Sequence, residues 1–118
     1  MYARDDSATA SHLQELPDAE HVAAAADAFR MLGDPTRRRI LWLLCRSESD
    51  VSSLVEQVEV ARPAVSQHLA KLRLAGLVGT HREGRRAVYR ARGGHVRRLL
   101  VEALGAADHR VTGAPDHP

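Results

Sequence analysis

Two short helical patterns within residues 50–76 constrain the fold most strongly, because only three residues separate them. In the first, Asp50 is suited to cap a helix that reaches Val58, and residues 59–61 form a tight connector. The second has Pro63 in its first turn and ends at Gly76. Its apolar inner face contains Val65, Leu69 and Leu72. Two helices joined this closely, the second with a polar outer face, predict a helix-turn-helix.

A basic alternating segment follows directly. Residues 77–82 and 85–90 alternate in the manner of β-strands, and Glu83 and Gly84 lie between them as the expected turn. The tip carries Arg82, Arg85 and Arg86. A basic hairpin after a helix-turn-helix is typical of the wing of a winged helix.

Helical periodicity also flanks this central segment. A first helix begins at Pro17 or Asp18 and stops at Gly33, and a second begins with Asp34 as its N-cap. A last helix covers residues 95–107 after a glycine pair. The predicted fold is therefore mainly α with a small β-hairpin (α+β), a dimeric winged helix-turn-helix in the order ααααββα.

A chain of 118 residues is long enough for one domain. We expect residues 18–109 to form the DNA-binding and dimerisation domain, because all periodic segments lie there. Residues 1–17 and 110–118 are predicted to be a flexible N-terminal arm and a flexible C-terminal tail. The polar residues 47–50 are predicted to be a turn.

Composition restricts the class of protein. Charged residues make up 27% and hydrophobic residues 44%, which is typical of a soluble domain. No apolar run approaches the length of a membrane span and no apolar segment begins the chain, so we expect a cytoplasmic protein. The single cysteine excludes an internal disulfide. No catalytic pattern of nucleophile and base, phosphate loop or paired carboxylates is present, so an enzyme is not expected.

The second helix of the helix-turn-helix and the hairpin present the residue types that bind double-stranded DNA. Small and hydrogen-bonding side chains near a helix start can reach base edges, and arginine or lysine can hold phosphates. A solvated basic face on an ordinary helical domain is the alternative, but the adjoining basic hairpin favours DNA. The predicted DNA-binding residues are Arg62, Ser66, Gln67, Lys71, Arg82, Arg85 and Arg86.

Three further side chains have more than one interpretation. His68 lies at the edge of the inner face, where a structural bridge to the neighbouring helix is favoured over a DNA contact. Cys45 lies on an apolar helix face and is predicted to be a buried, inert thiol. His81 belongs to the hairpin and is predicted to be merely exposed.

Three segments resemble motifs of the ArsR/SmtB family of repressors. Residues 29–37 (FRMLGDPTR), with Ile40 and Leu41 after them, are similar to the family's opening LADPTRxxIL. Residues 63–73 (PAVSQHLAKLR) resemble its recognition helix SxVSxHLxxLR, and residues 75–89 resemble its wing GLVxxxREGRxxxY. The resemblance covers about residues 20–110 and implies a winged-helix homodimer that binds operator DNA when metal-free and releases it when metal binds.

The family's soft-metal sensors carry a Cys-x-Cys pair on the first helix of the helix-turn-helix. Residues 51–56 contain no cysteine, so sensing of soft metals is disfavoured. The last helix offers His95 and His109 instead, 14 residues apart and therefore about 21 Å apart at ~1.5 Å per residue. One ion cannot reach both in one chain, whereas antiparallel pairing with a second copy would create two symmetric intersubunit sites.

The ligand set departs from the family's zinc sensors, whose last helix begins Asp-x-His, since Gly93 occupies the first position here. It resembles the actinobacterial nickel/cobalt-sensing members. That resemblance implies that His95, Asp108, His109 and His117 bind Ni(II) or Co(II), with Zn(II) as an alternative. His12 and His21 are further ligand candidates in the N-terminal segment.

We expect the first and last helices to form the dimer interface, because both have an apolar face. The residues predicted to be buried there are Val22, Phe29, Leu99, Leu100 and Leu104. The alternative function is a winged-helix regulator controlled by a partner protein or by no ligand, in which the C-terminal histidines are incidental.

Overall fold

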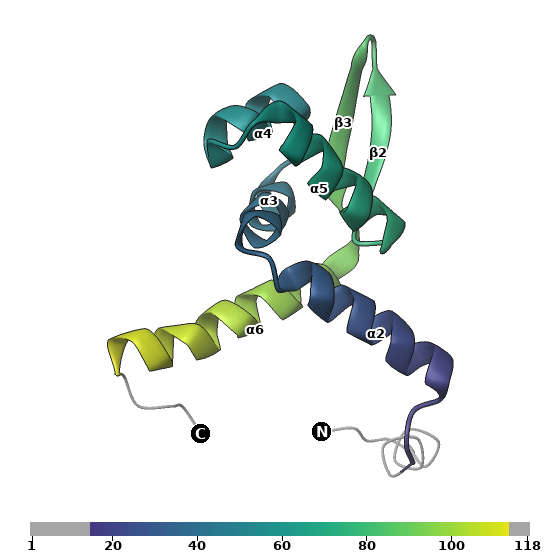
Figure 1. Ribbon diagram of the computed structural model, residues 1–118, viewed down its shortest axis with the longest axis vertical. Helices are drawn as coiled ribbons and strands as arrows, with labels where there is room; N and C mark the ends of the chain where they lie inside the picture. Colours follow the sequence, from purple (N-terminus) through teal and green to yellow (C-terminus); the bar gives the residue numbers. More distant parts are fainter. Residues whose placement is uncertain (1–14, 114–118) are drawn as a thin grey trace.

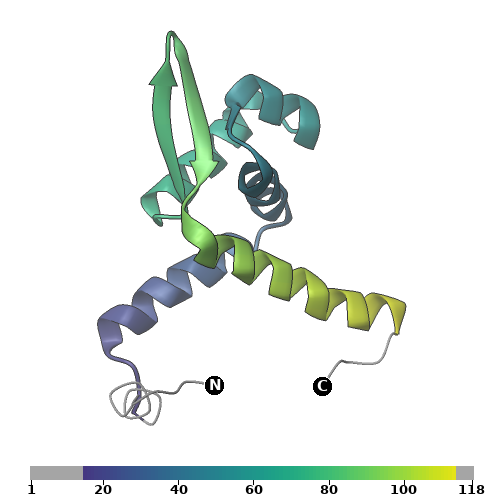
Figure 2. The same cartoon turned by 180° about the vertical axis from the view of Figure 1, so that it is seen from behind.

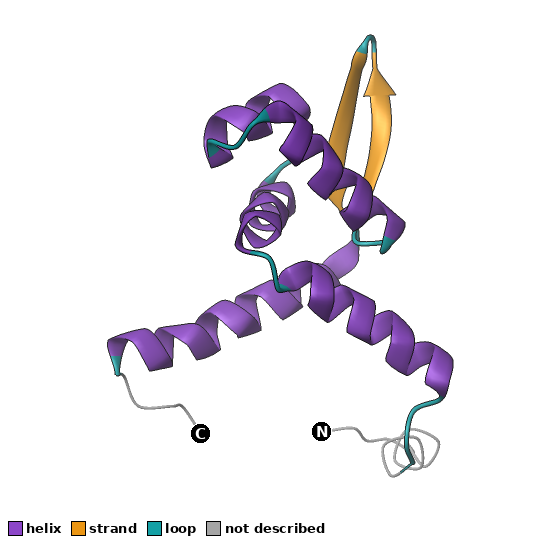
Figure 3. Cartoon of the chain, viewed as in Figure 1, coloured by secondary structure: helices purple, strands orange, loops and turns teal. Residues whose placement is uncertain are grey.

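The computed structural model describes residues 15–113, and Figure 3 shows that helices make up most of them. In chain order the elements are α2 (Ala19–Leu32), α3 (Pro35–Arg46), β1 (Ser49–Asp50), α4 (Val51–Val58), α5 (Arg62–Leu74), β2 (Val78–Glu83), β3 (Arg86–Ala91) and α6 (Gly93–Thr112). The predicted fold class is confirmed: a winged helix-turn-helix whose helices and hairpin follow the expected order. No helix among these residues combines the length and apolarity that crossing a membrane requires.

Three helices have an aspartate as N-cap: Asp34 and Asp50 were predicted as caps, and Asp18 is one of the two predicted starts of the first helix. The carboxylates of Asp18, Asp34 and Asp50 each accept the backbone N–H three residues later, at 2.8–2.9 Å. These bonds satisfy N–H groups that have no partner within the helix, and they lower the pKa of each carboxyl below its ordinary value. The caps therefore define where α2, α3 and α4 start.

α3 lies at the centre of the molecule and contacts α2, α4, α5, α6 and β3. Figure 1 shows α2 and α6 diverging at one end and the β2–β3 hairpin projecting at the other, and Figure 2 shows the same arrangement from behind. The buried core is almost wholly aliphatic and includes Ile40, Leu41, Leu44, Leu54, Val58, Val65, Leu69, Leu72, Leu77, Val78, Val96 and Leu100. The predicted inner face of α5 is confirmed by this list.

The loop of the hairpin lies one residue later than predicted. Glu83 pairs with Arg86, so the two loop residues are Gly84 and Arg85. Gly84 has a φ of +64°, and among the described non-glycine residues only Glu59 has a positive φ. A glycine with positive φ at the first loop position is the requirement of a type II′ hairpin turn, and this requirement sets the register.

β1 was not expected, because residues 47–50 were predicted to be a turn. Ser49 pairs with Tyr89 and Asp50 pairs with Val88, which gives a three-stranded antiparallel sheet in the order β1-β3-β2. A strand of two residues is too short to show an alternating pattern, so only the tertiary fold reveals it.

α6 is longer than the predicted helix over residues 95–107. It starts at Gly93, whose φ of +73° turns the chain directly from β3 into the helix. It ends before Gly113, whose N–H donates to the carbonyl of His109 at 3.0 Å in a left-handed conformation. The glycine pair therefore forms the first turn of the helix and does not precede it.

The assignment of Leu100 to the dimer interface is wrong. Its side chain is only 1% exposed within the single chain, because it packs into the core against α3. By contrast, Val22, Phe29 and Leu104 are 51%, 62% and 45% exposed. A charge at position 100 would therefore destabilise the core of the single chain, so only the exposed positions report on the interface.

The connector between α4 and α5 requires a left-handed residue. Glu59 has φ 56° and ψ 44°, and its N–H closes α4 by donating to the carbonyl of Val55 at 2.9 Å. A residue with a Cβ adopts this conformation at a cost of about 1–2 kcal/mol, whereas glycine adopts it freely.

Replacing Glu59 with glycine should raise the free energy of unfolding by about 0.5–1 kcal/mol. Relief of about 1–2 kcal/mol of strain exceeds the extra backbone entropy of glycine, which costs about 0.5–1 kcal/mol. The same replacement at Glu56, inside α4, should lower the free energy of unfolding by about 1 kcal/mol. Urea denaturation measures the free energy of unfolding of both variants. A Glu59→Gly variant less stable than its parent would contradict the claim that Glu59 is strained.

Candidate nucleic-acid interface and metal ligands

The outer face of α5 presents polar side chains to solvent. Ser66, Gln67 and Lys71 are exposed, and within residues 15–113 none of them makes a side-chain hydrogen bond or ion pair. The opposite face is held in the core by Val65 and Leu69. These three side chains are therefore free to contact a ligand without breaking the fold.

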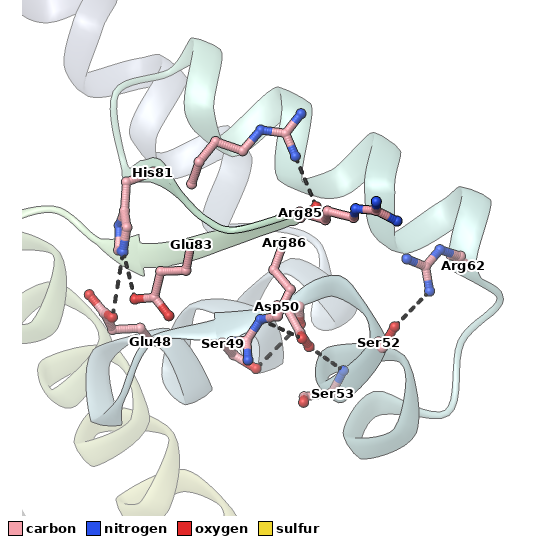
Figure 4. A network of polar contacts seen from close by, with 11 residues as sticks. Glu48, Ser49, Asp50, Ser52, Ser53, Arg62, His81, Glu83, Arg85 and Arg86 are labelled. Carbon is pink, nitrogen blue, oxygen red and sulfur yellow. Dashed lines mark hydrogen bonds and ion pairs between the residues drawn. The ribbon is translucent and has the colours of Figure 1, made fainter.

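The start of α5 is tied to α4. The guanidinium of Arg62 donates to Oγ of Ser52 at 2.9 Å, and Figure 4 shows this contact bridging the two helices of the helix-turn-helix. α5 has no side-chain N-cap; Pro63 lacks an N–H, and the N–H groups of Ala64 and Val65 donate to the carbonyl of Ala61 at 3.0 and 3.1 Å. The positive end of the helix dipole and the charge of Arg62 favour an anion there.

The three hairpin arginines have different roles in the structure. Arg82 donates to the carbonyl of Arg85 at 3.0 Å across the turn, and Nε of Arg86 lies 3.3 Å from the carboxylate of Asp50. The guanidinium of Arg85 has no partner among residues 15–113 and points away from the sheet in Figure 4. Arg85 is thus the most available of the three for a phosphate.

Asp50 joins the helix-turn-helix to the hairpin. Besides capping α4 it pairs with Arg86, and its side chain is 22% exposed. Its pKa is lowered chiefly by the N–H of Ser53 and further by the charges of Arg86 and Arg62. The sequence indicated the cap, but it carried no sign of the ion pair with a residue 36 positions later.

His68 has the predicted structural role. It is half-buried between α5 and α3, with Nδ1 3.4 Å from the guanidinium of Arg37 and Nε2 3.9 Å from the carboxylate of Asp34. Cys45 is half-buried, less than predicted, and burial raises the pKa of its thiol. A raised pKa keeps the thiol protonated, in agreement with an inert side chain.

The predicted metal ligands on α6 do not come together in one chain. His95 and His109 lie on the same continuous helix, so their separation of 14 residues places them about 21 Å apart. Asp108 and His95 are exposed and His109 is half-buried. His117 lies outside the described residues, as does His12. His21, the remaining candidate, contacts the carboxylate of Asp18 at 2.8 Å.

His95 has a competing partner. The guanidinium of Arg98 donates to its Nδ1 at 2.9 Å, which leaves the ring proton on Nε2. Because a metal-bound imidazole needs a lone pair on one nitrogen and carries its proton on the other, this hydrogen bond must break before His95 can bind an ion.

The prediction that His81 is merely exposed is wrong. It is half-buried, and its Nε2 lies 3.0 Å from Oε2 of Glu83 and 3.9 Å from Oε1 of Glu48. Of the described residues, only these three bring His, Cys, Asp or Glu ligand atoms together as a group. Glu48 comes from the segment before β1, so sequence reasoning could not link it to the hairpin.

Residues 34–80 match the family of bacterial regulatory proteins known as the arsR family. The HTH-type transcriptional regulator KmtR of Mycobacterium tuberculosis is 47% identical over 102 residues, which cover 86% of this chain and 78% of that protein. The chain belongs to the arsR family. As a member of this family it is a transcriptional regulator and not an enzyme, as predicted.

Other relatives agree with this assignment. The HTH-type transcriptional regulator NmtR of Mycobacterium tuberculosis is 36% identical over 102 residues, covering 86% of this chain and 85% of that protein. A solved homodimeric winged helix-turn-helix DNA-binding domain, Mb0332 of Mycobacterium bovis, superimposes with a TM-score of 0.76. It is 26% identical and covers 100% of both chains.

Proposed function

We propose that this chain binds operator DNA as a homodimer through α5 and the β2–β3 hairpin, and that Ni(II) or Co(II) on α6 changes its DNA affinity. The observation that carries the proposal is the outer face of α5. It offers unpaired polar side chains beside a hairpin arginine that also has no partner within residues 15–113, on a fold shared with regulatory proteins.

An α-helix with this outer face suits the major groove. Gln67 can make two hydrogen bonds to an adenine edge, and Ser66 can bond either a donor or an acceptor. Lys71 and Arg62 lie toward the two ends of the same helix, where DNA phosphates flank the groove. The hairpin would place Arg85 on the adjacent backbone, and Arg82 and Arg86 would support its shape.

Gln67→Ala should reduce discrimination between the operator and a mutated operator by about 1–3 kcal/mol, because a base contact is lost. Fluorescence anisotropy with the two duplexes measures the ratio of affinities. Unchanged affinity and unchanged discrimination would remove α5 from the role of recognition helix.

Arg85→Ala is the matched contrast. It should weaken binding to both duplexes alike and reduce the salt slope by about one phosphate, since the contact carries no base information. A change in discrimination at this position would contradict the assignment of Arg85 to the backbone.

The exposed apolar faces of α2 and α6 support the homodimer. The single chain leaves three large apolar side chains substantially exposed: Val22 at 51%, Phe29 at 62% and Leu104 at 45%. Leu99 and Val101 on α6 are also exposed, at 36% and 47%. Exposed apolar patches of this kind mark protein–protein contacts, and both helices diverge at the end opposite the hairpin.

Phe29→Asp should convert the dimer to monomers, because an unpaired charge would be buried at the interface while the chain's own core is untouched. Ala70→Asp, which adds the same charge to the exposed surface of α5, should leave the dimer intact. Light scattering distinguishes the two. A dimeric Phe29→Asp variant would exclude this face of α2.

α6 and the sequence that follows it contain the donor chemistry of a nickel or cobalt site. Imidazole nitrogens of His95 and His109, a carboxylate oxygen of Asp108 and the imidazole of His117 form the N/O set that such ions accept with five or six ligands. Because His95 and His109 are too far apart within one chain to share an ion, the proposed sites lie between subunits. A metal there would act as a clamp on the dimer.

The clamp can change DNA affinity only if the clamped and free dimers differ in the spacing of their two α5 helices. Coupling of this kind amounts to about 1–3 kcal/mol, or roughly 5- to 150-fold in DNA affinity. In this chain, the hydrogen bond from Arg98 to His95 would have to be released in the clamped state.

His95→Ala and His109→Ala should each abolish both intersubunit sites and the effect of Ni(II) on DNA affinity, since each site draws on both histidines. Glu102→Gln, an exposed carboxylate on the same helix, is the control and should change neither. Calorimetric titration with Ni(II) and with Zn(II) provides the measurement. Unchanged Ni(II) affinity in both histidine variants would leave a DNA-binding regulator controlled by a partner protein or by no ligand.

A further inference from the structure

A second group of metal-ligand atoms lies at the side of the hairpin, away from α6. His81 and Glu83 are two residues apart on β2, so their side chains point to the same face, and Glu48 approaches them from the segment between α3 and β1. Figure 4 shows the three side chains converging. One ligand atom from each residue lies within 4.8 Å of the other two.

The distances are close to those that a bound ion would impose. Ligands held at about 2.0–2.2 Å from a tetrahedral zinc ion are about 3.3 Å apart. Nε2 of His81 is already 3.0 Å from Glu83 and 3.9 Å from Glu48. Both glutamate side chains are exposed, so small rotations would complete the geometry without moving the backbone.

The charges of the cluster also favour a cation. Arg86 lies directly opposite Glu83 across the hairpin, yet its guanidinium is paired with Asp50. Within residues 15–113, neither Glu48 nor Glu83 has an arginine or lysine at ion-pair distance, although the hairpin is rich in arginine. A neutral His81 can donate its Nε2 proton to only one of the two carboxylates, whereas a divalent ion would neutralise both.

We propose that Glu48, His81 and Glu83 bind one divalent first-row cation per chain, with Zn(II) as the ion best suited to one nitrogen and two oxygen ligands plus water. The ion would join β2 to the segment that leads into β1. It would thereby hold the hairpin against the helical body independently of the proposed sites on α6.

The test uses Zn(II) alone and the full chain carrying His95→Ala and His109→Ala, so that the proposed α6 sites are absent. In this background, calorimetry should show a zinc site whose affinity falls at least tenfold when His81→Ala is added. Glu56→Gln is the control, because Glu56 is an exposed carboxylate on α4 that lies outside the group formed by Glu48, His81 and Glu83. It should leave zinc binding unchanged.

Glu48→Gln provides the second arm, because the amide keeps the size of the side chain and loses its charge. It should weaken zinc binding in the same background, and zinc should shift the amide NMR signals of residues 81–83 together with that of Glu48. Equal zinc binding by the background chain, its His81→Ala variant and its Glu48→Gln variant would overturn the proposal. Since the background lacks the α6 histidines, that result would leave the function proposed for α6 untouched.

Discussion

Burial of α3 organises the molecule, because each of the other described helices packs against it. Ile40 and Leu41 are 0% exposed, and α3 contacts α2, α4, α5 and α6 as well as β3 of the sheet. Burying an aliphatic side chain of this size contributes roughly 1.5–3 kcal/mol. Because the core contains almost no aromatic residue, this aliphatic packing positions α5 and the hairpin on one side of α3 and α6 on the other. The end proposed to bind DNA and the end proposed to form the dimer are therefore held by one shared helix.

Polar contacts further fix the arrangement of the helix-turn-helix and the hairpin, which the core holds in place. Asp50 caps α4, forms part of β1 and pairs with Arg86, so the helix-turn-helix and the hairpin meet at one carboxylate. His68 links α5 back to the cap of α3 through Asp34. These contacts restrain the angle between α5 and the hairpin, which is the quantity that a major-groove helix and its flanking wing must match to bind DNA. The hairpin arginines consequently differ in how free they are to contact a ligand: Arg82 and Arg86 are engaged by the hairpin turn and by Asp50, whereas the guanidinium of Arg85 has no partner within residues 15–113.

The positions of α2 and α6, away from α5 and the hairpin, explain why the single chain is incomplete as a regulator. Its core is closed, but α2 and α6 leave large apolar side chains uncovered, and α6 keeps His95 and His109 at opposite ends of one helix. A second copy of the chain would cover the exposed apolar side chains and bring His95 of one chain close to the other chain's His109. In the proposed function, dimerisation and metal binding therefore depend on the same helix, while DNA binding depends on elements at the far side of α3.

Local sequence patterns were enough to predict the helices, the aspartates that cap α2, α3 and α4, the inner face of α5 and the existence of the hairpin, because caps, periodicity and turn residues act over a few neighbouring positions. It also carried the motifs that identify the family. The folded chain revealed four features that these local patterns do not contain: Leu100 is core, β1 exists, Arg86 is paired with Asp50, and Glu48 lies beside His81. Each of these depends on the packing of elements far apart in the chain, which local periodicity does not encode.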